Sequence, residues 1–215
     1  RSGMPMSLRS LALGFLLTVT LGCERSTPRA ERAQEPLLSA TTTSAKPKSS
    51  TIPPLDVSLT FPNIESVGAK KRIRWEKTLA SEAHSPPDAL KIDFEKSGGF
   101  AALCWRNKPG NEGEAPGDDL SKAGYRRISF WAKGAAGGEV VEFRAGGMGN
   151  VKTRHQDTFD VTAGKLRLTT NWTEYGIYVS NADLSSVITP FCAGFHREDN
   201  AEHTVVYLDD IQYGG

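Results

Sequence analysis

The stretch DLSKAGYRRISFWAKGAAGGEVVEFRAGG, residues Asp119–Gly147, carries the pattern that decides the fold. Apolar and polar residues alternate in two short runs, Arg127–Lys133 and Val140–Ala145. Side chains that follow one another along a strand point to opposite faces of the sheet, so this period of two predicts strands. The glycine-rich AAGG between the runs is typical of a turn, and the stretch therefore predicts a pair of strands joined by a hairpin.

The same alternation continues in both directions from this pair. It predicts further strands at Lys71–Lys77, Leu90–Phe94, Phe100–Trp105, Leu166–Thr169, Tyr175–Val179, Val187–Phe195 and Thr204–Tyr213. No segment has an amphipathic period that lasts three helical turns. The sequence therefore predicts an all-β domain over residues 55–215, a two-sheet β-sandwich or jelly roll whose inner faces build one core.

Length and composition agree with one domain and appended segments. The chain has 215 residues, of which 38% are hydrophobic and 24% charged. Lys and Arg number 26 and Asp and Glu 25, so the net charge of +1 provides no general attraction for nucleic acid or an anionic membrane. No apolar run reaches the roughly 20 residues that a membrane-spanning helix needs.

Residues 1–23 have the proportions of an export signal. Arg9 precedes the apolar run Leu11–Leu21, and Cys23 follows without an A-x-A-like cleavage site. The segment resembles a bacterial lipoprotein signal with Cys23 as the lipidated residue, although Thr20 stands where such signals usually carry leucine. The alternative is an ordinary secretory signal with an incidental cysteine. The first predicts a lipid anchor in the membrane of the cell envelope and the second predicts secretion.

Residues 24–54 are rich in Pro, Ser, Thr and charge, and they predict a disordered linker before the folded domain. If Cys23 is lipidated, Cys104 and Cys192 remain as an even pair in a compartment where disulfides persist. Two readings stay open for this pair. The cysteines form a disulfide, or they are two small buried residues that never meet.

The alternation also predicts a polar face. If three of the predicted strands are neighbours, one face of their sheet carries both cysteines and four charged or titratable side chains, Arg106, Glu142, Arg144 and His196. Guanidinium forks bind hydroxyl pairs or uronate carboxylates, and a carboxylate accepts hydrogen bonds from hydroxyls, so the set could form the floor of a binding site. The alternative is a solvated sheet face with cross-strand charge pairs.

Three further residues suit sugar recognition. Trp105 and Asn107 stand at the start of a long Gly- and Pro-rich loop, where an indole could stack on a sugar ring and an amide could bond to its hydroxyls. Trp105 is also in phase with the core, which is its alternative role. Trp131 is either an exposed stacking platform or a cap on the second sheet. Trp172 is assigned to the core.

Three segments together carry a family resemblance. Asp119–Gly147, then LTTNWTEYGIYVSNADLSSVITPF (Leu168–Phe191) and the closing VYLDDIQY (Val206–Tyr213), resemble the galactose-binding-like jelly roll of carbohydrate-binding modules attached to glycoside hydrolases. The resemblance covers roughly Leu90–Tyr213. It implies non-catalytic binding of a polysaccharide or other glycan. It also implies a structural calcium with Asp209 as a ligand.

Motifs of enzymes are missing from the sequence. It contains no G-x-S-x-G, H-E-x-x-H, C-x-x-C, Walker loop or complete G-x-G-x-x-G. A pair of catalytic carboxylates depends on spatial separation, which leaves a lyase or hydrolase as a third possibility. The expected function is therefore glycan binding, with a lipoprotein that docks a protein partner as the alternative. A groove with an exposed aromatic over Arg144 and Glu142 favours a glycan, and a flat apolar patch favours a protein.

Overall fold

The computed structural model describes residues 55–57, 63–68, 73–95, 99–149, 152–200 and 203–215. These residues form strands and a single turn of 3₁₀ helix, Arg197–Asp199. The strands are β1 (Leu55–Asp56), β2 (Asn63–Gly68), β3 (Ile73–Lys77), β4 (Leu90–Glu95), β5 (Phe100–Arg106), β6 (Arg127–Gly134), β7 (Val140–Gly146), β8 (Asp160–Arg167), β9 (Thr173–Tyr178), β10 (Phe191–His196) and β11 (His203–Gly214).

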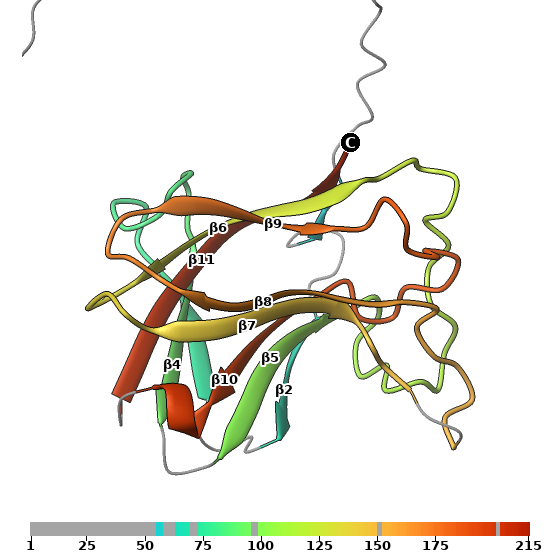
Figure 1. Ribbon diagram of the computed structural model, residues 1–215, viewed down its shortest axis with the longest axis horizontal. Helices are drawn as coiled ribbons and strands as arrows, with labels where there is room; N and C mark the ends of the chain where they lie inside the picture. The colour runs from blue at the N-terminus through green and yellow to red at the C-terminus, as the bar shows by residue number, and fades with distance from the viewer. Residues whose placement is uncertain (1–54, 58–62, 69–72, 96–98, 150–151, 201–202) are drawn as a thin grey trace, which may run out of the picture. The chain divides into compact units, whose positions relative to one another are not determined.

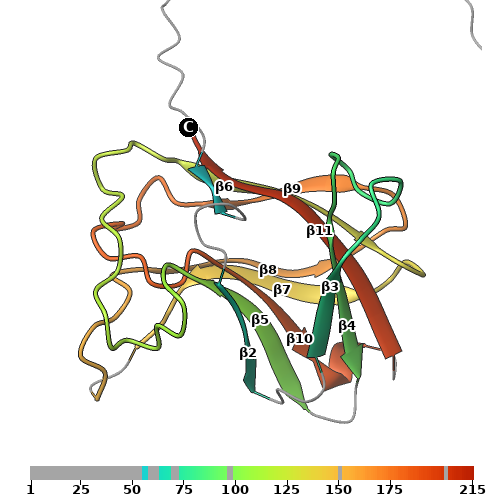
Figure 2. The ribbon, with the colours of Figure 1, turned by 180° about the vertical axis from the view of Figure 1, so that it is seen from behind.

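The strands form two antiparallel sheets. One sheet has six strands in the order β3-β4-β11-β6-β9, with β1 paired to the end of β11. The other has five strands in the order β2-β5-β10-β7-β8. Figures 1 and 2 show the two sheets facing each other, with β6 and β9 opposite β7 and β8. The predicted all-β sandwich is confirmed.

The core fills the space between the sheets. Along β6 buried residues alternate strictly with less buried ones, as a strand with one inner face requires. Phe130 of this strand meets Phe143 of β7 with ring centroids 4.5 Å apart and Phe191 of β10 with centroids 5.0 Å apart. Aromatic pairs across the two sheets therefore hold the sandwich together.

Some strands differ from the prediction. The short β1 and β2 were not predicted, and β8 begins at Asp160 rather than at Leu166. Strand β8 lies at the edge of its sheet, and its alternation of exposed and partly buried residues is interrupted at Gly164, where its register against β7 shifts. Only its second half was therefore recognised. Strand β10 begins at Phe191, because Val187 forms an isolated bridge with Asp118 instead.

Three long connections, β5–β6, β7–β8 and β9–β10, lie together at one end of the sandwich (Figures 1 and 2). The carboxylate of Asp157 joins two of them, because it accepts hydrogen bonds from the backbone N–H groups of Met148, Ile188 and Thr189. Burial raises the pKa of Asp157, and these N–H groups oppose that rise. The end of the sandwich is thus an ordered network.

The predicted signal at residues 1–23, the lipidation of Cys23 and the linker at residues 24–54 all lie outside the described residues. They stay predictions. Within the described part of the chain, no helix is long and apolar enough to cross a membrane.

Candidate functional site

The outer face of the five-stranded sheet brings most of the predicted site residues together. Strands β5, β10 and β7 are neighbours, which is the adjacency that the sequence argument had to assume. Side chains on this face line a groove of about 220 Å³. Arg106, Glu142 and Arg144 are among its lining residues, and His196 contacts Glu142.

A disulfide forms the floor of this groove. Cys104 of β5 and Cys192 of β10 stand directly opposite each other, and their sulfur atoms are bonded. Ala102 and Gly194 continue the floor on the same two strands. These residues are small, so the floor lies below the longer side chains around it.

Phe100 is the exposed aromatic side chain of the groove, with 42% of its surface accessible. Its ring lies over Gly194, because a Cβ atom placed on that glycine would come within 3.2 Å of the Phe100 ring. The His196 ring lies beside it, with centroids 4.9 Å apart. In the sequence Phe100 marks only the start of a predicted strand. Its alternation with Ala102 and Cys104 was the signal that could have placed it on the outer face.

The charged side chains of the groove are paired with one another. The Arg144 guanidinium donates to both oxygens of Asp160, at 2.6 and 2.8 Å. The His196 ring nitrogen Nε2 lies 2.9 Å from a carboxylate oxygen of Glu142. These pairs are partly exposed, so ligand groups can reach them from solvent.

Arg106 stands at the end of the groove and is only 2% exposed. It donates a hydrogen bond of 2.6 Å to the Thr189 hydroxyl, and its Nε lies 3.6 Å from Glu65. Burial lowers the pKa of Arg106, while Glu65 opposes that shift. The predicted binding role of Arg106 therefore becomes mainly a supporting one, since its guanidinium is engaged inside the protein.

The structure places Trp105 and Asn107 away from the groove surface. Trp105 is 2% exposed and meets Phe191 edge-on at 5.3 Å, which is the core role left open above. The Asn107 amide donates to the Pro116 carbonyl and accepts from Asn111, so it organises the loop that follows β5. Neither side chain is presented to an outside ligand, because each is buried and already engaged.

Trp131 lies on the outer face of the other sheet. The imidazole of His84 stacks on it with ring centroids 3.7 Å apart and an interplanar angle of 16°. Trp172 is also outside the core, contrary to its assignment, and the Lys133 ammonium lies 4.8 Å from its ring centroid. Trp131 and Trp172 are therefore packed against protein groups, whereas Tyr178 on the same sheet is 76% exposed.

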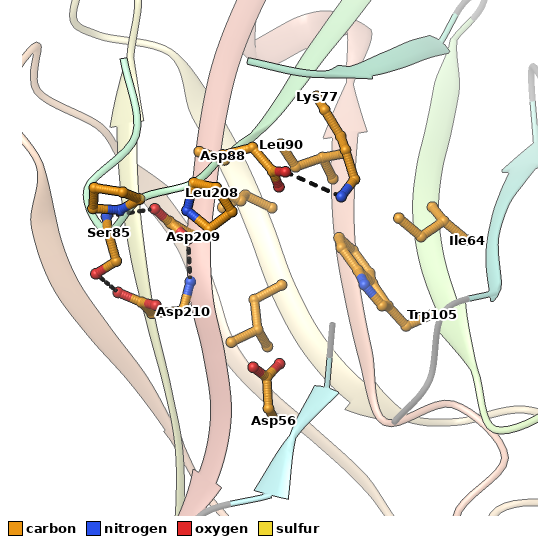
Figure 3. Close-up of a pocket in the computed structure, with 14 residues that line it drawn as sticks. Asp56, Ile64, Lys77, Ser85, Asp88, Leu90, Trp105, Leu208, Asp209 and Asp210 are labelled. Atoms are coloured by element: carbon orange, nitrogen blue, oxygen red, sulfur yellow. Dashed lines mark hydrogen bonds and ion pairs between the residues drawn. The ribbon is translucent and has the colours of Figure 1, made fainter. Parts of the chain in front are cut away.

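Asp209, the predicted calcium ligand, contacts the loop between β3 and β4. One of its oxygens accepts the backbone N–H groups of His84 and Ser85, both at 2.9 Å, and the other accepts the N–H of Asp210 at 2.8 Å. The Asp210 carboxylate accepts the Ser85 hydroxyl at 2.6 Å and lies 3.0 Å from His84 Nδ1 (Figure 3). Among the described residues, His84, Asp209 and Asp210 have ligand atoms close enough together to share a metal ion.

A second cavity, of about 460 Å³, opens beside this cluster between the two sheets (Figure 3). Trp105 and Leu208 give it apolar walls. At its rim the Lys77 ammonium is paired with Asp88 at 3.1 Å. Figure 3 shows Lys77 and Asp88 approaching each other, and the Trp105 ring that lines the cavity is only 2% exposed.

No family model matches the sequence, and no curated protein matches it. Solved structures do match the fold. The family 30 carbohydrate-binding module of a Clostridium thermocellum cellulosomal cellulase is 19% identical, with a TM-score of 0.50 over 70% of this chain and 90% of that one. The family 11 module of the same organism, solved with a β-1,3-1,4-mixed-linked tetrasaccharide, is 11% identical, with a TM-score of 0.53 over 75% and 94%.

An exo-β-agarase also matches, with 12% identity and a TM-score of 0.50, but over only 24% of its chain. The chain thus has the β-sandwich fold of carbohydrate-binding modules, some of which are parts of larger enzymes. At these identities the similarity establishes the fold, and the residues of the groove must carry any argument about function.

Proposed function

We propose that the groove on the five-stranded sheet binds a carbohydrate and that the domain is a non-catalytic binding module. The observation that carries this proposal is the exposed ring of Phe100, which lies over Gly194 beside polar side chains. The apolar face of a sugar ring packs on an aromatic ring, while its hydroxyls need donors and acceptors around the edge.

The paired charges of the groove favour an uncharged sugar. Arg144 is balanced by Asp160, and His196 lies against Glu142. A uronate or sulfate group would add a negative charge to a rim whose arginine is already paired with a carboxylate. Hydroxyl groups, in contrast, can share the outer lone pairs and N–H groups of these pairs without separating them.

The shape of the site favours a glycan chain over a flat protein partner. The groove follows the outer side chains of β5 from Phe100 to Arg106. Six steps at about 3.3 Å per residue give a length of about 20 Å, which is longer than one sugar ring. A protein partner would be expected to cover a broader apolar patch. The shared fold with modules of families 30 and 11 supports the same proposal.

Catalysis is the less favoured alternative. The groove carboxylates Glu142 and Asp160 are each engaged by a basic side chain within 3 Å. Each carboxylate would have to leave its basic partner before it could donate or accept a proton at a glycosidic bond. The Ser85 and His84 side chains outside the groove also lack relay geometry, because the same ring nitrogen of His84 faces both Ser85 and Asp210.

We further propose that residues 1–23 export the protein and that Cys23 carries a lipid, with residues 24–54 as the tether of the displayed domain. The support is the basic residue, apolar run and cysteine of that segment. Mass spectrometry of the mature N-terminus after expression in a bacterium tests this, since it distinguishes a diacylated Cys23 from an unmodified chain cleaved elsewhere.

Binding of the full chain to an array of neutral and acidic polysaccharides tests the main proposal. We expect retention by a neutral glycan and an affinity loss of about tenfold in Phe100→Ala, the order expected when one stacking aromatic is removed. Tyr178→Ala is the matched control, because Tyr178 is an exposed aromatic, 76% accessible, on the other sheet. A folded wild-type chain that binds no glycan would overturn the proposal, and release of sugar products would overturn its non-catalytic part.

A further inference from the structure

The loop between β3 and β4, residues 78–89, is fastened to β11 by four residues that we call the latch: His84, Ser85, Asp209 and Asp210. Strand β11 carries a β-bulge at this point, because its register against β6 shifts between Asp209 and Gln212. Asp210 adopts a left-handed backbone conformation, with φ of 49°. The bulge presents two consecutive carboxylates to the loop, which a regular strand would point to opposite faces.

Three of the four carboxylate oxygens of the latch accept hydrogen bonds. Both oxygens of Asp209 accept backbone N–H groups, and one oxygen of Asp210 accepts the Ser85 hydroxyl. Calcium binds six to eight oxygen lone pairs from carboxylates, carbonyls and water. An N–H or O–H group that points at the same oxygen places a positive hydrogen where the cation would lie. The nitrogen of His84 is also a poor ligand for a hard cation. These residues therefore do not fit calcium, although their ligand atoms are close together.

The loop is held at its base and at its tip without any cation. At the base, the N–H of Thr78 donates to the Ala89 carbonyl at 2.8 Å, and the N–H of Ala89 donates to the Thr78 hydroxyl at 3.0 Å. At the tip, the His84 ring stacks on Trp131 at 3.7 Å. Packing, hydrogen bonds and two carboxylates together account for the position of the loop.

We infer that the hydrogen bonds of the latch hold the β3–β4 loop against β11, which is the structural role that the family resemblance assigns to calcium. The domain then folds and keeps this loop in place without the metal. The inference is independent of the proposed carbohydrate site, since the latch lies on the other sheet. It also explains why Trp131 is no sugar platform, because the latch keeps His84 over its ring.

Thermal unfolding of the full chain, in EDTA and in added calcium, tests the inference. We expect the same Tm for the wild type in both. Asp209→Ala leaves two loop N–H groups without an acceptor, and we expect it to lower Tm by about 5–10 °C in both conditions. His84→Ala should lower Tm by a smaller amount. The matched controls are His203→Ala and Asp93→Ala, which break a similar His–Asp pair of 2.9 Å at a more exposed place and should change Tm by about 2 °C or less.

A calcium-dependent rise in the wild-type Tm that Asp209→Ala removes would overturn the inference. Latch variants with the Tm of the wild type would overturn it as well. If Asp209→Ala does not fold, His84→Ala and Ser85→Ala decide the question. A fall in their Tm that is equal in EDTA and calcium supports the latch, and a fall that calcium reverses refutes it.

Discussion

Phe100 and Trp131 are aromatic side chains on the outer faces of the two sheets, and their surroundings are opposite. On the five-stranded sheet, Phe100 lies open over a glycine and beside paired charges. On the six-stranded sheet, Trp131 lies under the ring of His84, which hydrogen bonds hold in place. The larger and more strongly stacking residue is thus the one that a ligand cannot use. What covers an aromatic ring decides its role, more than the type of ring does.

The two faces are also fastened differently. Neighbouring strands of the groove face are joined by the covalent bond between Cys104 and Cys192, whereas the opposite face holds its loop by the hydrogen bonds of the latch. The groove face buries the ionic contacts of Arg106, and the other face leaves those of Arg127 exposed. Substitutions that remove the contacts of one face, compared with matched substitutions elsewhere, test each of these contrasts.

The disulfide should have the largest effect. Its cysteines are separated by 88 residues in the sequence, and a cross-link over a loop of that size is expected to stabilise the fold by about 4 kcal/mol. We predict that the double variant Cys104→Ala, Cys192→Ala loses about this free energy of unfolding in urea titrations. Cys23→Ala is the control and should unfold like the wild type. A loss below about 1 kcal/mol would show that neighbouring strand contacts already hold the groove floor.

Removal of the buried Arg106 side chain should cause the second largest loss of stability. Arg106 is 2% exposed and donates to Thr189 at 2.6 Å, so Arg106→Ala is predicted to cost about 2–3 kcal/mol of stability. Arg127→Ala breaks the exposed pair with Glu174, at 2.9 Å, and should cost less than about 1 kcal/mol. The midpoints of urea unfolding measure both. Equal losses of stability would mean that the burial of Arg106 does not make its contacts more stabilising than the exposed contacts of Arg127.

The contact between the Phe100 ring and Gly194 can be tested by its effect on glycan affinity. A Cβ atom on Gly194 would lie 3.2 Å from the Phe100 ring, which requires the ring to shift by a few tenths of an ångström. Gly194→Ala is therefore predicted to weaken glycan binding by about two- to threefold, or less than 1 kcal/mol. In a Phe100→Ala background the same substitution should change nothing, because the ring that it displaces is gone. Additive losses of glycan affinity in the double variant would show that Gly194→Ala acts independently of the Phe100 ring.

The sequence predicted this groove better than it predicted the opposite face. Period-two alternation placed Glu142, Arg144 and His196 on one face, and the neighbouring strands needed only to pair in register. The same rule placed Trp131 outside the core but contained no sign of the loop that covers it. That loop contacts residues 124 to 126 positions further along the chain, so no local pattern could reveal it.

The exposure suggested for Asn107 has a similar origin. Its position at the mouth of a loop suggested a free amide, but that amide bonds to the Pro116 carbonyl and to Asn111 within the loop. Trp105 has the core role that its phase along the strand left open. Phe100 was missed because it served only to mark the start of a predicted strand and was not assigned to a face. Alternation indicates the face of a side chain, and packing across the sheet decides whether that face is covered.

The smallest predicted effect is a change in the stability of the fold with pH. Asp157 holds the loops at the end of the groove as Asp209 holds the loop of the opposite face, since each accepts three backbone N–H groups. Burial raises the pKa of Asp157 above that of an unfolded chain, so the folded state binds the proton more readily. Stability linked to this group is therefore complete below the unfolded pKa of about 3.9 and is lost as pH rises through the higher folded pKa.

Asp157→Asn removes this titration while it keeps one oxygen as an acceptor for the N–H groups of Ile188 and Thr189. The stability of the wild type relative to this variant should therefore increase as the pH falls from about 7 to about 4. Urea midpoints of both chains across that range measure the difference, and subtraction cancels the groups that they share. Parallel profiles would mean that the three N–H groups offset the burial completely. The Asp157 carboxylate would then be as stable as an anion in the folded protein as it is in the unfolded chain.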